Sequence, residues 1–205
     1  MNTLGLPGVD FVPRLSGPAE DATDNTDDQH TPQWLLDLVA ELWPDGIDVD
    51  PCWARGSLVQ ARLTYDGSTP ERDGLALPWS GRTVWCNPPY SRPGPWADRM
   101  AKHAASTPNA EGLLLVNTTT TTKWWRRWRP APGQRGATWS KQREAAVSRG
   151  AVGIGAARVA FFNKRISFLK HGVARDQNRF DQKLLYWGDG GQAFAKIFGQ
   201  VAWVP

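Results

Sequence analysis

A strand, a helix and a second strand follow one another in the middle of the chain, and this succession constrains the fold more than any other feature. Residues 82–86 predict a short apolar strand that stops at Asn87-Pro88-Pro89, because proline lacks the amide proton that a sheet requires. Residues 96–105 have the apolar spacing of a helix, and residues 112–116 predict a buried strand. Two strands joined by a helix pack as a parallel pair with a right-handed crossover. The sequence therefore predicts an α/β fold in which helices and sheet form three layers.

Further elements flank this unit on both sides. Thr31 is predicted to cap a helix that has Pro32 at its first position and a regular apolar spacing. Residues 46–49 predict a strand that ends at the turn Asp50-Pro51. Four later segments have the composition of strands, and the last of them are expected to form an antiparallel edge: residues 158–162, 166–169, 183–187 and 201–204.

Length and charge distribution indicate one domain with an N-terminal arm. A chain of 205 residues suits one well-filled core better than two. Residues 1–29 have little apolar periodicity and an acidic second half, so we expect a disordered or loosely held arm before a domain over residues 30–205. Within that domain, residues 123–157 predict a long basic insertion, rich in tryptophan, that leaves the core. The net charge of +4 and this basic cluster indicate a polyanionic partner.

Composition also argues against several classes of protein. The longest apolar runs are far below the roughly 20 residues of a membrane span, and the first residues lack the layout of a signal peptide, so we expect a cytoplasmic protein. Cys52 and Cys86 have no paired spacing and are predicted as small core residues. The three histidines show no ligand spacing, so no metal site is predicted.

The tetrapeptide Asn87-Pro88-Pro89-Tyr90 has the composition expected of a site that methylates an exocyclic amine. The lone pair of such an amine is delocalised into its ring, which makes the nitrogen a poor nucleophile. The side-chain carbonyl of Asn87 and the backbone carbonyl after it can accept hydrogen bonds from the amine, and proline fixes the backbone without a competing donor. The Tyr90 ring can stack on a base that has been rotated out of a duplex. These four residues are the predicted catalytic site.

A simple turn is the alternative, since asparagine and proline are common in turns and a four-residue match can arise by chance. The apolar strand that runs directly into the tetrapeptide favours the site. Asp50-Pro51 and residues 117–122 also follow predicted strands, and ligands of open α/β sheets bind at the carboxyl ends of strands. We therefore expect the three segments to converge, with residues 117–122 at the pocket mouth; a linker is the alternative for that last segment.

The order of these motifs resembles the phage-type DNA adenine methyltransferase (Dam) family. The resemblance covers residues 30–122 and a later element, and it rests on Thr31-Pro32, Asp50-Pro51, Asp73-Gly74-Leu75, Trp79, Trp85-Cys86-Asn87-Pro88-Pro89-Tyr90-Ser91 and Arg165-Ile166-Ser167-Phe168. Residues 123–157 are longer and more basic than the family leads us to expect. Many methyltransferases have Gly-x-Gly after the first strand, whereas this chain has the single Gly56, which we interpret as a turn residue.

This resemblance implies a Rossmann-like fold that binds S-adenosylmethionine and methylates the N6 amine of adenine in double-stranded DNA, as in phage DNA modification. It makes residues 30–205 a methyltransferase domain at work in the cytoplasm of a host cell. Thr31 would contact the methionine end of the donor, Asp50 and Pro51 would form the turn beneath the donor, and Asp73 would contact its adenine or ribose. Thr31 and Asp73 have equally ordinary interpretations as a helix cap and a turn residue.

The basic segment Lys123-Trp124-Trp125-Arg126-Arg127-Trp128-Arg129 combines cations with aromatic rings. Cations can contact phosphates, and rings can contact unstacked bases, so Lys123, Trp124, Arg126 and Arg127 are predicted to bind DNA. The alternative is an amphipathic helix whose tryptophans pack into the core while its arginines are solvated.

The sequence is also compatible with two other functions. Asn-Pro-Pro-Tyr also occurs in methyltransferases that modify RNA or the glutamine amides of proteins, and here the basic, tryptophan-rich segment favours nucleic acid. A non-catalytic DNA-binding module would use its tryptophans to stack bases and would keep the tetrapeptide as a turn. A hydrolase is not favoured, because the chain has neither a Gly-x-Ser-x-Gly elbow nor a phosphate loop.

Overall fold

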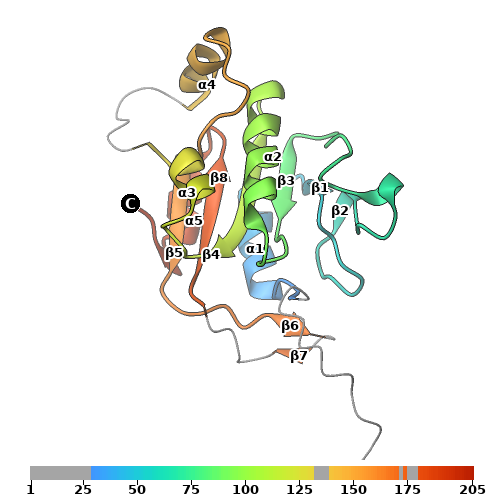
Figure 1. Cartoon of the computed structure of the whole chain (residues 1–205). Helices are drawn as coiled ribbons and strands as arrows, with labels where there is room; N and C mark the ends of the chain where they lie inside the picture. Colours follow the sequence, from blue (N-terminus) through green and yellow to red (C-terminus); the bar gives the residue numbers. More distant parts are fainter. Residues whose placement is uncertain (1–28, 132–138, 171–172, 175–179) are drawn as a thin grey trace, which may run out of the picture.

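A mixed sheet of seven strands forms the centre of the computed structural model, which describes residues 29–131, 139–170, 173–174 and 180–205 (Figure 1). The strand order is β2-β1-β3-β4-β8-β5-β9. In chain order these strands are β1 (Ile47–Asp50), β2 (Ala61–Thr64), β3 (Thr83–Cys86), β4 (Glu111–Asn117), β5 (Arg158–Phe162), β8 (Gln182–Trp187) and β9 (Ala202–Trp203). Two short strands, β6 (Leu169–Lys170) and β7 (Val173–Ala174), form a separate antiparallel pair.

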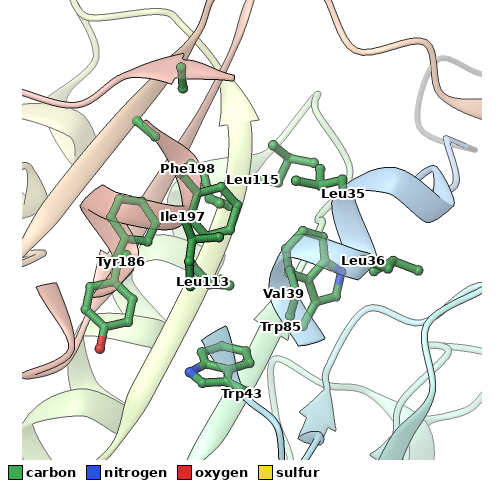
Figure 2. Packing of buried hydrophobic residues seen from close by; sticks show 14 of the residues in the cluster. Leu35, Leu36, Val39, Trp43, Trp85, Leu113, Leu115, Tyr186, Ile197 and Phe198 are labelled. Atoms are coloured by element: carbon green, nitrogen blue, oxygen red, sulfur yellow. The ribbon is translucent and has the colours of Figure 1, made fainter. Parts of the chain in front are cut away.

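Helices cover both faces of this sheet. They are α1 (Gln33–Leu42), α2 (Pro93–Ser106), α3 (Lys123–Trp128), α4 (Trp139–Ser148) and α5 (Gly191–Phe198), with a short 3-10 helix η1 (Pro70–Arg72). Successive side chains of a strand point to opposite faces, and β4 shows this directly. Leu113 and Leu115 pack with α1 and α5, as Figure 2 shows, whereas Leu114 and Val116 pack with α2 and α3. The α/β class and the three-layer arrangement are as the sequence predicts.

Strand directions define where a ligand can bind. The strands β2, β1, β3 and β4 are mutually parallel, and β8 runs antiparallel between β4 and β5. From β1 the chain places β2 on one side and β3 on the other, so the strand order reverses between β1 and β3. In open α/β sheets this switch point leaves a crevice at the carboxyl ends of the strands. The parallel crossover from β3 through α2 to β4 and the antiparallel edge confirm two predictions from the sequence.

Helix α1 begins one residue later than its predicted cap implies. Pro32 occupies the N-cap position, and no side chain caps the helix. Thr31 is 1% exposed and its hydroxyl bonds to Asn87, so the prediction of Thr31 as a helix cap is wrong. The helix is held by its apolar face, in which Leu35 and Val39 pack on the sheet beside Trp85 (Figure 2).

The later part of the chain departs from the prediction in three ways. Residues 166–169 were expected as one strand, but only Leu169 belongs to one, in the small pair β6–β7. Strand β2 and helix α5 were not predicted at all. The insertion does not leave the core throughout, because Trp125 of α3 and Trp139 of α4 are both buried.

The predicted arm lies outside the described residues except for Gln29, whose backbone carbonyl accepts a hydrogen bond from Asn87. Within the part of the chain that the structure describes, no helix is both long enough and apolar enough to cross a membrane.

Candidate active site

A cavity of about 810 Å³ opens at the switch point, over the carboxyl ends of β1, β2 and β3. Its wall includes residues that directly follow each of these strands, together with the segment that leads into α1. The lining residues predicted from the sequence are Thr31, Asp50, Pro51, Asp73, Asn87 and Pro89; further ones are Gln29, Trp53, Tyr65, Asp66, Trp85 and Trp96. The convergence expected for the Asp50 and Asn87 segments is therefore observed.

The turn after β1 presents a buried carboxyl group to this cavity. Asp50 is 3% exposed, and its Oδ1 accepts a hydrogen bond from the backbone amide of Cys52 at 3.1 Å. Burial raises the pKa of Asp50 to about 7, although the hydrogen bonds from Cys52 act in the opposite direction. The carboxyl group can thus change charge near neutral pH, and a cationic ligand would favour its ionised form.

Two cysteines connect the ends of β1 and β3. The Sγ atoms of Cys52 and Cys86 are 3.5 Å apart, and both belong to or pack against the core beside the cavity. Burial raises the pKa of both thiols, so they remain protonated and chemically quiet at neutral pH. Cys86 is a core residue, as predicted, while Cys52 is half-buried and also lines the cavity.

The amide of Asn87 is held in one orientation. Its Nδ2 donates to the carbonyl of Gln29 at 2.9 Å and to the hydroxyl of Thr31 at 3.3 Å. Both donor positions of the amide are therefore used by the segment that precedes α1. The Oδ1 atom accepts no hydrogen bond from the described residues, which leaves it available as an acceptor.

The segment that holds Asn87 is itself fixed by a distant part of the chain. The backbone of His30 exchanges two hydrogen bonds of 2.9 Å with the backbone of Leu169. Leu169 follows Phe168, whose ring packs edge-on against Tyr90 with centroids 5.7 Å apart. Residues 168–169 therefore support the tetrapeptide from both ends.

The other members of the tetrapeptide have different surroundings. Pro88 is buried and Pro89 lines the cavity, whereas Tyr90 does not line it. The Tyr90 ring is half-buried, and its hydroxyl is buried without a hydrogen-bond partner among the described residues. Burial raises the pKa of Tyr90 well above its usual value. In this arrangement the ring contacts Phe168, and stacking on a base remains a prediction.

Asp73 and Gly74 form a turn that abuts the turn after β1. The Oδ1 of Asp73 accepts a hydrogen bond from the backbone amide of Leu75 at 2.8 Å, as a turn-forming aspartate does. The carbonyl of Gly74 accepts a bond from the indole of Trp79 at 2.7 Å. A Cβ atom at Gly74 would lie 1.8 Å from the carbonyl oxygen of Pro51, so only glycine fits between the two turns. Asp73 thus lines the cavity and also stabilises its own turn.

Asp66 is a cavity residue that the sequence analysis missed. It follows β2, and its Oδ1 accepts bonds from Arg72 at 2.8 Å and from Ser68. The hydrogen bonds from Arg72 and Ser68 hold the pKa of Asp66 well below its usual value, so it is ionised. The signal that could have found it is the position of an aspartate after a strand. That strand was not recognised because Ala61–Thr64 contains no buried residue.

Two expectations about the surroundings of the site have clear outcomes. Residues 117–122 do not line the cavity, so the prediction of a pocket-mouth loop is wrong; β4 is one strand away from the switch point, and this segment turns instead toward β8. Gly56 has φ +87° and does not line the cavity, in agreement with a turn residue. Among the described residues, no group of three or more histidine, cysteine or acidic side chains could hold a metal ion.

The predicted DNA-binding residues lie on α3, and their environments differ. Lys123 and Arg126 are exposed. Arg127 is also exposed but lies 3.9 Å from Asp98 and over the ring of Trp128. Trp124 is half-buried and packs edge-on against Trp125, which favours the packing interpretation for this ring.

The second half of the insertion lies away from the cavity. Arg143 of α4 donates to the carbonyls of Ala104 and Ala105 at the C-terminal end of α2, and Figure 1 shows α4 at the end of the molecule opposite β6 and β7. Helix α3, by contrast, packs against the N-terminal part of α2, where Trp124 lies next to Gly94.

Comparison with known proteins agrees with this geometry. A family model described as DNA N-6-adenine-methyltransferase (Dam) matches residues 21–134. The chain is also similar to the DNA N-6-adenine-methyltransferase of Haemophilus phage HP1 (strain HP1c1), with 30% identity over 94 residues, which are 46% of this chain and 51% of that protein. The chain thus spans about half the length of this relative, and no solved structure matches. Because the family model covers more than half of the chain, including the whole cavity wall, the chain belongs to the DNA N-6-adenine-methyltransferase (Dam) family.

Proposed function

We propose that this protein transfers a methyl group from S-adenosylmethionine to the N6 amine of adenine in double-stranded DNA, with the target adenine rotated out of the duplex. Residues 30–205 form the methyltransferase domain, and their sheet is a Rossmann-like one with its ligand crevice between β1 and β3. Membership of the Dam family and the position of the cavity support this proposal.

The observation that carries the proposal is the fixed amide of Asn87. Gln29 and Thr31 use both hydrogens of Nδ2, so Oδ1 is an acceptor with a set direction at the end of β3. A turn residue would not need its amide fixed by a segment 56 residues away in the chain. A preorganised acceptor of this kind stabilises a transition state without having to reorganise during the reaction.

Asn87 and Pro88 then activate the adenine. The N6 amine donates one hydrogen bond to Asn87 Oδ1 and one to the backbone carbonyl of Pro88, which draws the nitrogen lone pair out of conjugation with the ring. The nitrogen forms a bond to the methyl carbon as the carbon–sulfur bond of the donor breaks, and the amine loses a proton to solvent. Tyr90 stacks on the extruded base and keeps it in plane with these acceptors.

The residues of the cavity fit S-adenosylmethionine. The cavity volume of about 810 Å³ lies within the range of pockets for ligands of this size. The donor carries positive charge and ribose hydroxyls, and Asp50, Asp66 and Asp73 provide acidic groups around the cavity. Gln29 Oε1 and Trp85 Nε1 are buried without partners among the described residues, and a bound ligand would satisfy such atoms. Thr31 and Pro51 complete the contacts to the donor, which supplies the methyl group.

DNA binds through the exposed cations of α3. Lys123 and Arg126 point to solvent at the start of the helix, where α3 runs beside the N-terminal part of α2. Arg127 contributes after releasing its weak ion pair with Asp98. Contacts of this type position the duplex without reading its sequence.

The test is incubation of the purified protein with unmethylated duplex DNA and methyl-labelled S-adenosylmethionine, followed by nucleoside analysis. Label in N6-methyladenosine is the expected result, and Asn87→Ala should reduce it at least about 100-fold with the fold retained. Asn163→Ala, which changes an exposed asparagine outside the cavity, is the matched control.

Other outcomes would redirect the proposal. Label in RNA or in a glutamine amide, with none in DNA, would identify a different acceptor. DNA binding without any label and without donor binding would contradict the enzyme and favour a non-catalytic DNA-binding module.

A further inference from the structure

Lys183 is a fully buried lysine that the proposed reaction does not use. It lies near the start of β8, opposite Val116 of β4 and Phe161 of β5, and its exposed fraction is 0%. No carboxylate among the described residues pairs with it. Burial lowers the pKa of Lys183 to about 7. A methionine or leucine would fill this space at lower desolvation cost, so the ammonium group requires a specific reason.

The partners of this ammonium group all belong to the segment after β4. Its Nζ donates to the backbone carbonyl of Thr119 at 3.0 Å and lies 3.5 Å from the centre of the Trp125 ring. Trp124 is the next closest ring, at 5.5 Å. An ammonium group over the face of tryptophan is attracted by the ring, most strongly where water is excluded.

Lys183 therefore connects the sheet to a helix that is too short to be stable by itself. Helix α3 has six residues, fewer than an isolated helix needs to be stable in water. Its first turn is capped by the hydroxyl of Thr122, which accepts from the amide of Trp125 at 3.4 Å. Trp125 also meets Phe161 edge-on, so the ring is fixed between β5 and Lys183.

We infer that Lys183 is a positioning residue for DNA binding: by holding the Thr119 carbonyl and the Trp125 ring, it fixes helix α3 on the sheet with Lys123 and Arg126 directed outward. This inference rests on the proposed function, because it assigns those two cations to DNA. Since phosphate contacts depend on where cations are placed, loosening α3 weakens DNA binding without touching the donor cavity, which none of these residues lines.

The test compares Lys183→Met with Lys196→Met, which makes the same substitution at an exposed position on α5. We expect the Kd for a duplex of fixed sequence to rise about tenfold in Lys183→Met, equivalent to about 1.4 kcal/mol. The slope of log Kd against log salt should become shallower, because fewer phosphates are contacted. The Kd for S-adenosylmethionine and the rate at saturating DNA should stay as in the parent protein, and Lys196→Met should change none of these quantities.

A purely structural role gives a different pattern. Loss of donor affinity in parallel with DNA affinity, or a DNA Kd within about threefold of the parent value, would overturn the inference. If Lys183→Met does not fold, Trp125→Phe serves instead, since it keeps a ring of weaker attraction for the ammonium group and should raise the DNA Kd in the same direction. DNA and donor binding are measured without methyl transfer, so an inactive parent protein would contradict the proposed function and leave this comparison intact.

Discussion

The hydroxyl of Thr31 lies 3.3 Å from Asn87 Nδ2 and accepts a hydrogen bond from it. This contact joins the segment before α1 to the end of β3, and it gives Thr31 a position at the candidate reaction centre. The resemblance to the Dam family implies a contact of Thr31 with the donor. The geometry adds a second possible effect, on the orientation of the catalytic amide, and the two effects can be separated by kinetics.

Thr31→Val keeps the shape of the side chain and removes the acceptor. If Thr31 orients Asn87, kcat should fall about tenfold at saturating donor and DNA, the magnitude of one hydrogen bond, while the donor Kd stays constant. Thr31→Ser keeps the hydroxyl and should retain the parent kcat. A raised donor Kd with unchanged kcat would instead assign Thr31 to donor binding alone.

Asp50 should make stability depend on pH. Its pKa is about 7 in the folded protein because of burial, against 3.8 for the ordinary side chain. The folded state therefore binds the proton more tightly than the unfolded state, and stability falls as pH rises from about 4 to about 7. Without donor, the free energy of unfolding of the parent protein should drop by roughly 3 kcal/mol between about pH 5 and about pH 8 relative to Asp50→Asn, as measured by urea denaturation.

Asp48 provides a control of opposite sign on the same strand. Burial acts to raise its pKa, but hydrogen bonds from the backbone amides of Thr83 and Arg82 outweigh it and hold the pKa of Asp48 below its usual value. Its stabilising contribution is present at neutral pH and lost as pH falls below about 4. Asp48→Asn should therefore lower stability at about pH 7. If Asp50→Asn and Asp48→Asn gave the same dependence of the free energy of unfolding on pH, the opposite pKa shifts of the two carboxyl groups would be contradicted.

The glycine between the two cavity turns should tolerate no side chain. Gly74→Ala places a Cβ atom against the carbonyl of Pro51, and a clash with backbone cannot be relieved by a rotamer change. We expect a loss of stability of about 2 kcal/mol or more and weaker donor binding, because the turn that carries Asp50 must shift. Gly150→Ala is the control: its φ is +82° and its surroundings are open, so it should cost about 1 kcal/mol and leave donor binding unchanged. Thermal melts and donor titration would separate the two.

Local patterns predicted the part of the fold that contains the tetrapeptide. Apolar runs of β3 and β4 and the spacing of α2 gave the parallel crossover, and the prolines after Cys86 gave the strand end. Strand β2 could not be predicted in this way, because Ala61–Thr64 has an exposed arginine and no buried side chain. Its pairing with β1 comes from backbone hydrogen bonds at a sheet edge, which leave little trace in hydrophobicity.

Only those residues of the candidate site that stand directly after a predicted strand could be predicted from the sequence. Asp50 and Asn87 stand directly after strands, so their convergence could be expected. The bonds from Asn87 to Gln29 and Thr31 join residues more than 50 positions apart and depend on tertiary packing. The wrong prediction that residues 117–122 lie at the pocket mouth also reflects tertiary packing. Periodicity could not show that β8 pairs antiparallel with β4.

The hydroxyl of Tyr90 gives a prediction whose sign is unusual for a buried tyrosine. It is buried without a hydrogen-bond partner among the described residues, whereas the ring contacts Phe168. A buried hydroxyl without a partner costs about 1–3 kcal/mol relative to a satisfied one, so Tyr90→Phe should raise the free energy of unfolding by about 1 kcal/mol.

Tyr65→Phe is the matched comparison, because the hydroxyl of Tyr65 donates to the carbonyl of Pro78 at 2.7 Å and its removal should lower stability by up to about 1 kcal/mol. Urea denaturation of both variants measures the difference directly. Destabilisation by Tyr90→Phe would mean that the hydroxyl has a hydrogen-bond partner in solution and would contradict this prediction.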